Sequence, residues 1–180
     1  MFSSSEAWSV LDSAEEVCSA PEVEQALGRV ASEITNSLGD AYPLILSVMG
    51  GAVIFTGKLL PLLRFPLDFD YIHASRYGNA TQGTTLEWKV MPKENVKDRV
   101  VLVLDDILDE GHTLAAIREK VMGMGARSFH CAVFADKKIA SAKPIQADFV
   151  GLSLPDRYVF GFGMDVKGAW RNLPAIYALK

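Results

Sequence analysis

The most constraining feature of the sequence is an unbroken run of branched apolar residues, Val-Val-Leu-Val-Leu, at residues 100–104. An alternating strand has one face in water, whereas an unbroken apolar run is typical of a strand buried on both faces of a parallel sheet. Residues 44–48 form a second run of this kind. Shorter strands are predicted at residues 67–73, 84–90, 129–135, 149–152 and 159–162.

Helices are predicted between these strands. Apolar residues recur at three- and four-residue steps in residues 9–38, with a break at Pro21, and helical segments are also expected at residues 52–63 and 114–124. Residues 105–113 are expected to form a tight polar loop. The alternation of strands and helices predicts an α/β fold with a mostly parallel central sheet flanked by helices.

The composition narrows the class of protein. The chain has 180 residues, of which 49% are hydrophobic and 22% are charged, and this length favours a single domain over residues 1–180. A net charge of −4 gives no basic surplus for nucleic acid or an anionic membrane, so neither is expected as a partner. The two cysteines lie far apart and the first residues lack the order of a secretory signal, so a cytoplasmic location is expected.

An acidic cluster follows the apolar run at residues 100–104. Asp105, Asp106 and Asp109 come within five residues, and Gly111 and Thr113 begin the next helix. A helix start with a close-approach glycine and a hydroxyl suits a phosphate, while paired carboxylates suit the two hydroxyls of a ribose, or Mg²⁺ through waters. Helix capping would explain one aspartate. Three crowded carboxylates raise each other's pKa, which indicates a ligand or cation.

This segment resembles the phosphoribosyl pyrophosphate motif of the type I phosphoribosyltransferases: a buried strand, two acids, two apolar residues, an aspartate and a small turn that ends in threonine. Other segments are similar to the hypoxanthine-guanine branch of that family. Ser-Val-Met-Gly-Gly at residues 47–51 resembles its pyrophosphate loop, and Ala-Ser-Arg-Tyr-Gly at 74–78 its flexible lid. Ala-Asp-Lys at 135–137 resembles the strand end with a purine-reading lysine, and residues 149–173 resemble its hood.

The resemblance implies a fold and an activity. The expected architecture is the type I phosphoribosyltransferase fold, with N-terminal helices at about 9–38, a core at about 44–152, a small hood mainly at 153–180 and a flexible lid. The implied reaction is purine salvage: transfer of 5-phosphoribosyl from phosphoribosyl pyrophosphate to hypoxanthine or guanine, giving IMP or GMP and pyrophosphate. Mg²⁺ is the implied cofactor, and a homodimer or homotetramer is the implied assembly.

The resemblance also implies a role for each matching residue. Asp109 is the expected catalytic base. The ribose and 5-phosphate are expected to be bound by Asp105, Asp106, Asp109, Glu110, Gly111, His112 and Thr113. The purine is expected to be bound by Lys137, which would donate to its C6 oxygen and disfavour adenine, by the stacked ring of Tyr158 and by the backbone of Val159. Pyrophosphate is assigned to Met49, Gly50, Gly51, Arg76, Tyr77 and Arg171. Mg²⁺ is assigned to Asp165, Asp105 and Asp106.

Some positions depart from the family pattern. Met49 stands where members commonly carry lysine, so pyrophosphate is expected to rely on the backbone N–H groups of residues 49–51, with Arg76 as the hypothesised replacement charge. A non-proline cis peptide at Val48–Met49 is implied. Glu110 is expected to face solvent or to pair with a cation. His112 is expected either to donate a proton to the phosphate or to face solvent in its neutral form.

Several alternatives remain open at this stage. The residues around Lys137 and Val159 do not decide base preference at purine C2, so a xanthine-preferring enzyme is one alternative. A non-catalytic phosphoribosyl pyrophosphate-binding regulator is another, although the net charge of −4 and the lack of a Lys/Arg cluster before Pro43 count against it. A plain α/β nucleotide-binding module is the third. A subunit interface or the core would each explain Phe55, Leu59, Leu60 and Leu63.

Overall fold

The computed structural model describes residues 2–77, 85–91 and 96–180, and at residues 75–77 and 85–86 it describes the backbone alone. The elements in chain order are α1 (Ser4–Ser13), β1 (Glu15–Cys18), α2 (Ala20–Leu38), β2 (Leu44–Val48), α3 (Val53–Leu59), the 3-10 helix η1 (Leu60–Leu62), β3 (Asp68–Tyr77), β4 (Thr85–Val90), β5 (Val100–Leu108), α4 (His112–Gly123), β6 (Ser128–Lys138), β7 (Phe149–Pro155), β8 (Val159–Phe160) and β9 (Ile176–Ala178).

The main sheet has the strand order β4-β3-β2-β5-β6-β7. The neighbours from β3 to β7 pair in parallel, whereas β4 pairs antiparallel with β3. The prediction of a mostly parallel α/β sheet is therefore confirmed. The central run at residues 100–104 pairs with β2 on one side and β6 on the other, which explains why it has no polar face.

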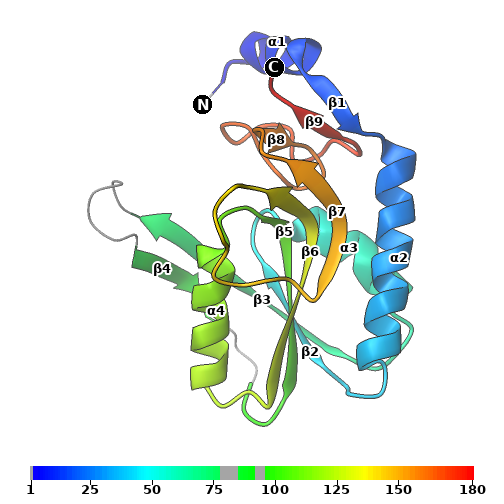
Figure 1. The fold of residues 1–180 in the computed structure, drawn as a ribbon, viewed down its shortest axis with the longest axis vertical. Helices are drawn as coiled ribbons and strands as arrows, with labels where there is room; N and C mark the ends of the chain where they lie inside the picture. The colour runs from blue at the N-terminus through cyan, green and yellow to red at the C-terminus, as the bar shows by residue number, and fades with distance from the viewer. Residues whose placement is uncertain (1, 78–84, 92–95) are drawn as a thin grey trace.

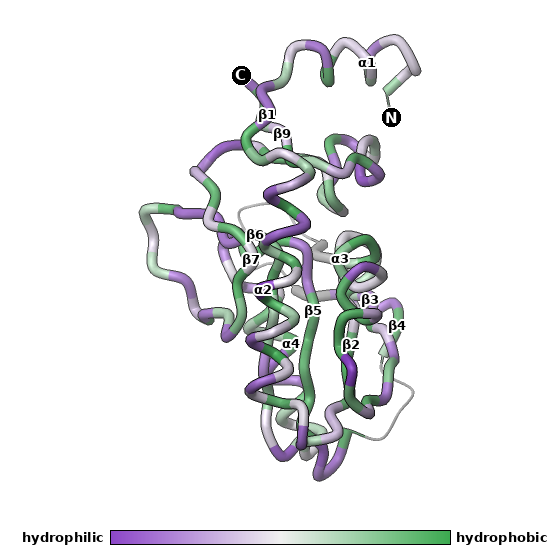
Figure 2. Tube along the Cα trace, turned by 90° about the vertical axis from the view of Figure 1, so that its right-hand side faces the viewer, coloured by the Kyte–Doolittle hydropathy of each residue, from purple (hydrophilic) through white to green (hydrophobic). Residues whose placement is uncertain are grey.

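Two apolar layers cover this sheet. Leu102 and Leu104 pack in the cluster that includes α2 and α3, while Val101 and Val103 pack in the cluster that includes α4. Figure 1 shows α4 on one side of the sheet and α2 on the other, and Figure 2 shows hydrophobic stretches along β2 and β5. Phe55, Leu59 and Leu63 are buried inside the chain, so they belong to the core.

A second, smaller sheet forms the hood above the carboxyl ends of the main strands. Its order is β1-β9-β8, and both pairings are antiparallel. Strand β1 from the N-terminal region therefore lies beside β9 from the C-terminal region, as Figure 1 shows. The ring of Trp8 on α1 meets Trp170 edge to face at 5.0 Å between centroids.

The N-terminal region differs from the predicted pair of helices. The first helix ends at Ser13, and Glu15–Cys18 is a strand paired with β9. The expectation of a helix through Val17 was wrong because the partner of this strand lies at the other end of the sequence. The break before the second helix is confirmed: Ser19 and Glu22 form a capping box, and Pro21 lies in the first turn.

The segment at residues 105–113 also differs from the predicted loop. Strand β5 continues to Leu108 because Ile107 and Leu108 pair with Ala135 and Asp136 of β6. Asp105 and Asp106 therefore project from a strand, and the turn is confined to residues 109–111. The predicted strand at 84–90 is present as β4. The segment at 74–78, expected to be a flexible lid, instead continues β3 to Tyr77 because it pairs with β4, and residues 78–84 lie outside the described residues. Among the residues that the structure describes, no helix is long and apolar enough to cross a membrane.

Candidate active site

A polar cleft of about 440 Å³ lies beyond the carboxyl ends of β2 and β5. Ligands of open α/β sheets bind at this edge. The cleft is lined by the ends of four regions that are distant in sequence: Val48, Met49, Gly50, Gly51, His73, Ala74, residues 105–114, Asp165 and Arg171. The structure thus brings most of the predicted donor-binding residues to one place.

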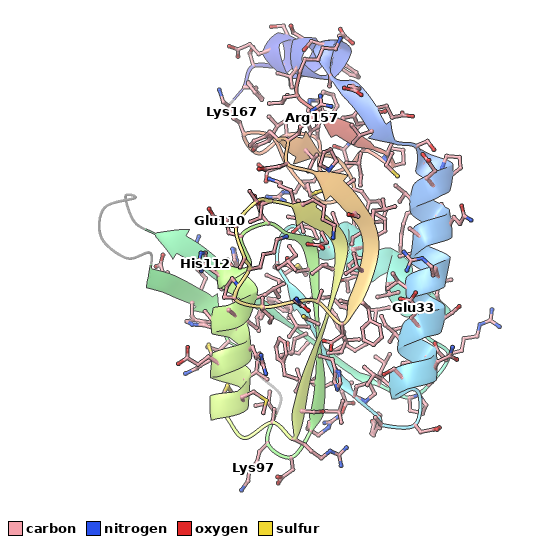
Figure 3. All side chains as sticks on the ribbon, in the orientation of Figure 1. Glu33, Lys97, Glu110, His112, Arg157 and Lys167 are labelled. Atoms are coloured by element: carbon pink, nitrogen blue, oxygen red, sulfur yellow. The ribbon has the colours of Figure 1, made fainter. Side chains whose placement is uncertain are left out.

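The turn into α4 forms one end of the cleft. Gly111 has a φ of 83°, a left-handed conformation that favours glycine, and its carbonyl accepts from Ala115 N–H at 3.0 Å. The first N–H groups of a helix lack acceptors within the helix, so this turn presents donors to an anion. Glu110 and His112 are exposed, and Figure 3 shows both at the upper end of α4.

The acidic pair lies beneath this turn. Burial, with a contribution from the neighbouring Asp106 charge, raises the pKa of Asp105 well above its usual value. Burial also raises the pKa of Asp106, against the opposing effects of its contacts with Asp105 and Arg171. Crowding was expected to be the reason, but loss of hydration is the larger cause at both residues. A diol or a cation would restore the polar contacts that burial removes.

The loop after β2 closes the opposite side of the cleft. Its non-proline cis peptide is Met49–Gly50, so the expected position, Val48–Met49, was wrong by one bond. The N–H of Met49 donates to the carbonyl of Ile72 at 2.8 Å. The expectation that this N–H would bind pyrophosphate was therefore wrong because the group already pairs with β3. Of the three backbone N–H groups expected to bind pyrophosphate, those of Gly50 and Gly51 remain as candidates.

The hood reaches the acidic pair through Arg171 and Asp165. One guanidinium nitrogen of Arg171 lies 2.5 Å from an Asp165 carboxylate oxygen, and the other donates to the carbonyl of Gly163 at 2.6 Å and lies 3.9 Å from Asp106. The second Asp165 oxygen accepts from Gly168 N–H at 2.6 Å. These contacts fix both side chains at the mouth of the cleft.

A smaller cavity of about 200 Å³ adjoins the cleft under the hood. Its lining comprises Asp106, Ile107, Asp109, Lys137, Tyr158, Val159, Met164 and Asp165. The exposed Tyr158 ring is fixed by its hydroxyl, which donates to the carbonyl of Asp165 at 3.1 Å. Val159 is buried in β8. The three residues predicted to bind a purine therefore share one cavity.

Asp109 lies at the junction of the two cavities and lines both. Lys137 Nζ donates to Asp109 Oδ2 at 2.8 Å, with side chains that are 12% and 50% exposed respectively. From the sequence, Asp109 was expected to be a base and Lys137 a purine contact, with no contact expected between them. Their direct pairing follows from the parallel alignment of β5 with β6.

Comparison with known proteins agrees with this geometry. The family model described as "Phosphoribosyl transferase domain" matches residues 13–167. The chain belongs to the phosphoribosyltransferase family. Among curated relatives, it is 33% identical over 164 residues to the hypoxanthine-guanine phosphoribosyltransferase of Bacillus subtilis, covering 90% of this chain and 91% of that protein.

Two further matches are informative. The chain is 32% identical to the hypoxanthine-guanine-xanthine phosphoribosyltransferase of Tritrichomonas foetus, covering 88% of this chain and 87% of the relative. A solved hypoxanthine-guanine-xanthine phosphoribosyltransferase superposes with a TM-score of 0.85 at 30% identity, covering 94% of this chain and 99% of the other. The type I phosphoribosyltransferase fold expected from the sequence is confirmed.

Two residues that line the cleft of this phosphoribosyltransferase were not assigned to the site from the sequence, and two assigned side chains lie outside the described residues. His73 and Ala74 line the cleft. His73 was not predicted, and Ala74 was expected only as the first residue of the lid segment. A signal existed for them, because Val48 at the end of β2 pairs with Ile72, so the next residues of β3 pass the end of β2. The side chains of Arg76 and Tyr77, both assigned to pyrophosphate, lie outside the described residues.

The phosphoribosyltransferase carries carboxylates suited to a hard cation. Within residues 2–77, 85–91 and 96–180, no group of three or more His, Cys, Asp or Glu side chains is arranged to hold a metal by itself. Mg²⁺ commonly binds through one or two carboxylates and completes its shell with water and substrate phosphates. The half-buried Asp165 at the cleft mouth, together with the buried Asp105 and the half-buried Asp106, fits this kind of binding.

Proposed function

We propose that this chain is a purine salvage enzyme that transfers 5-phosphoribosyl from phosphoribosyl pyrophosphate to hypoxanthine or guanine, yielding IMP or GMP and pyrophosphate. One observation carries the proposal: Asp109 lines both cavities, with the phosphate turn on one side and Lys137 and Tyr158 on the other. The names of the relatives and of the matched structure support the same reaction.

The larger cavity is proposed to bind the donor. The 5-phosphate accepts hydrogen bonds from the turn at residues 111–113, and the ribose hydroxyls donate to Asp105 and Asp106. The pyrophosphate lies against Gly50 and Gly51, with Arg171 as its cation. Arg76 remains our proposed substitute for the lysine that position 49 lacks. Binding of the phosphate end positions the reactive C1 beside Asp109.

The smaller cavity is proposed to bind the base. The Tyr158 ring offers an apolar face for the purine, and Lys137 donates to the oxygen at C6. A 6-aminopurine would present donors to this ammonium, so adenine is disfavoured. Lys137 then donates both to Asp109 and to the C6 oxygen of the purine. This arrangement places the base within reach of both side chains.

The proposed reaction forms one bond and breaks one. The N9 lone pair of the purine attacks C1, the C1–oxygen bond to pyrophosphate breaks, and the leaving group takes that electron pair. Asp109 accepts the proton that the purine ring loses, and its carboxylate faces the positive charge that develops on the sugar. When bound, Mg²⁺ would neutralise charge on the pyrophosphate, and Asp165, Asp105 and Asp106 are the residues that would hold it.

The first experiment is a direct assay with the donor, Mg²⁺ and each of four bases in turn, with pyrophosphate release as the readout. We expect turnover with hypoxanthine and guanine and little with adenine. Turnover with none of the four would overturn the assignment as an enzyme and favour a donor-binding regulator, which calorimetry with the donor would then detect.

Asp109 gives a sharper test of the mechanism. Asp109→Asn should lower kcat on the order of 10²–10⁴-fold, the usual range for a general base, while the fold is retained because the side chain is half exposed. Circular dichroism and steady-state kinetics measure the two effects. Near-native kcat in the folded variant would remove Asp109 from the mechanism.

Xanthine is the alternative substrate that a specific observation favours. Two of the matched proteins carry xanthine in their names beside hypoxanthine and guanine. Lys137 reads the oxygen at C6, which all three bases share, so the contact does not discriminate at C2. Ratios of kcat/KM among the three bases decide this preference.

We also propose the assembly and the location of the protein. Residues 1–180 are treated as one phosphoribosyltransferase domain. A homodimer or homotetramer is proposed, and the exposed apolar side chains of Val53, Leu62 and Phe69 support it. Sedimentation velocity measures the assembly. A cytoplasmic location is proposed, in keeping with two free, buried cysteines, Cys18 and Cys131.

A further inference from the structure

Lys143 lies behind the active site, in the connection between β6 and β7. Its side chain is 12% exposed. Its ammonium donates to Asp136 Oδ1 at 2.7 Å, to the carbonyl of Lys137 at 2.6 Å and to the carbonyl of Leu108 at 2.7 Å. An ammonium has three N–H donors, so these acceptors match its full capacity.

The three acceptors lie at the carboxyl ends of β5 and β6, next to the proposed base and the proposed purine contact. Leu108 immediately precedes Asp109, and Lys137 is the proposed purine contact. Leu108 and Asp136 are also paired across β5 and β6. The ammonium of the half-buried Lys143 therefore connects the backbone next to Asp109 to the backbone of Lys137, the proposed purine contact.

The residues after Lys143 support the phosphate turn by a different kind of contact. A Cβ placed on Gly111 would lie 3.3 Å from Ile145 and 3.4 Å from Pro144, so both apolar side chains pack directly against the turn. This packing does not depend on the charge of Lys143. The connection between β6 and β7 thus supports the purine side through an ammonium and the donor side through apolar contact.

We propose that Lys143 is a positioning residue for the purine half of the reaction. By holding the carbonyls of Leu108 and Lys137, it keeps the side chains of Asp109 and Lys137 at the spacing where they meet, 2.8 Å apart. Loss of the ammonium removes the donor to one oxygen of the half-buried Asp136 carboxylate and one donor to each of the two carbonyls, so the strand ends separate or shift. The inference rests on the proposed function.

The test compares Lys143→Met with Lys138→Met. Lys138 also pairs with Asp136, at 3.1 Å, but its side chain is 66% exposed. Both variants remove one lysine charge beside the same carboxylate, and Lys143→Met additionally removes the donor to the two carbonyls. Steady-state constants for hypoxanthine and for the donor are measured with each variant, together with Tm.

For Lys143→Met we expect kcat/KM for hypoxanthine to fall about 10–100-fold, the range for hydrogen bonds to a charged group, through both a higher KM for the base and a lower kcat. The KM for the donor should change by less than about twofold because the Gly111 packing is retained. Lys138→Met should leave all three constants within about twofold. Lys143→Arg, which keeps the charge, should recover part of the loss.

Two results would overturn the inference. One is a lower Tm with unchanged constants for the folded enzyme, which would make Lys143 a stabilising residue only. The other is an equal rise in both KM values. If Lys143→Met does not fold, Lys143→Gln, which also removes the charge, takes its place, and an unchanged KM for hypoxanthine in that variant would likewise overturn the inference. Inactivity of the unmodified chain on every base would instead overturn the proposed function itself.

Discussion

Asp105 shows at the scale of a single residue how the site conflicts with stability. Its carboxyl is buried at 8% exposure beside a second carboxyl. The raised pKa means that the folded state holds a proton more tightly than the unfolded chain. Stability therefore falls as the pH rises from the ordinary aspartate pKa, ~3.9, towards the raised value, and the full cost is present above it.

Asp105→Asn is expected to stabilise the protein at neutral pH, because asparagine keeps the oxygen that accepts from Asp106 N–H and carries no charge. A gain on the order of 1 kcal/mol corresponds to a Tm rise of about 2–4 °C. The gain should disappear below about pH 4. Thermal melts across this pH range measure it, with the exposed Asp12→Asn as control. A lower Tm at neutral pH would contradict the prediction.

Position 51 has no room for a side chain because the Asp106 carboxylate lies close to Gly51. A Cβ at this position would lie 2.0 Å from Asp106 Oδ2, so Gly51→Ala must displace the carboxylate. The displaced Asp106 carboxylate would lose its proposed hydrogen bond from a ribose hydroxyl of the donor. Loss of one hydrogen bond to a charged group should raise the KM for the donor by about 10-fold or more.

Gly57→Ala is the matched control, because a Cβ there meets nothing within 4 Å. It should leave the donor KM unchanged and raise stability by about 0.4–1 kcal/mol. Similar donor KM values for the two alanine variants would show that the contact between Gly51 and Asp106 has no part in donor binding.

At the scale of elements, local patterns predicted most of the main sheet. The apolar runs of β2 and β5 and the capping box before α2 depend on neighbouring residues, so sequence alone indicates them. The short strands β1 and β9 depend on each other from opposite ends of the chain. Since a helical spacing of apolar residues also fits the region around Val17, the sequence could not distinguish the two structures.

The same distinction applies to the site. The acids and the phosphate turn lie within one short segment, so their chemistry could be predicted together. The contact of Lys137 with Asp109, the closure of Gly51 on Asp106 and the role of Lys143 all depend on how separate strands align. These features required the register of β5 against β6.

Helix α1 contacts the hood through an aromatic pair and a hydrogen bond. Trp8 packs on Trp170, whose indole N–H donates to the carbonyl of Ala7 at 2.9 Å. Trp8→Ala should free α1 and loosen the segment that carries Arg171. Because an aromatic pair contributes about 0.5–1.5 kcal/mol, we expect KM values to rise by about 2- to 10-fold with a small change in Tm.

Steady-state kinetics and thermal melts check this prediction, with Asp12→Ala as a control on the same helix. Asp12 is exposed, and its removal should leave the KM values unchanged. Kinetic constants for Trp8→Ala that equal those of the control would mean that α1 has no influence on the hood.

At the scale of the whole molecule, the two substrates are proposed to meet different parts of the fold. The sugar and 5-phosphate of the donor lie on the main sheet and α4, which packs on one face of that sheet. The base lies between the end of this sheet and the hood, where Tyr158, Val159 and Met164 are contributed from the smaller sheet and its loops. The hood also contributes Asp165 and Arg171 to the donor cleft. Changes in the hood should therefore alter base recognition and the binding of the pyrophosphate end of the donor more than the binding of the 5-phosphate.

The pairing of Glu15 with Ala178 joins two strands that lie far apart in the sequence. Contacts between residues so remote in sequence carry a large loop-closure entropy and form slowly. The small sheet should be the last part to assemble and the first to open under mild denaturant, ahead of global unfolding. Hydrogen exchange should find its amides less protected than those of β5. A partly opened chain of this kind would still present the phosphate turn to the phosphorylated sugar but would no longer retain the acceptor base.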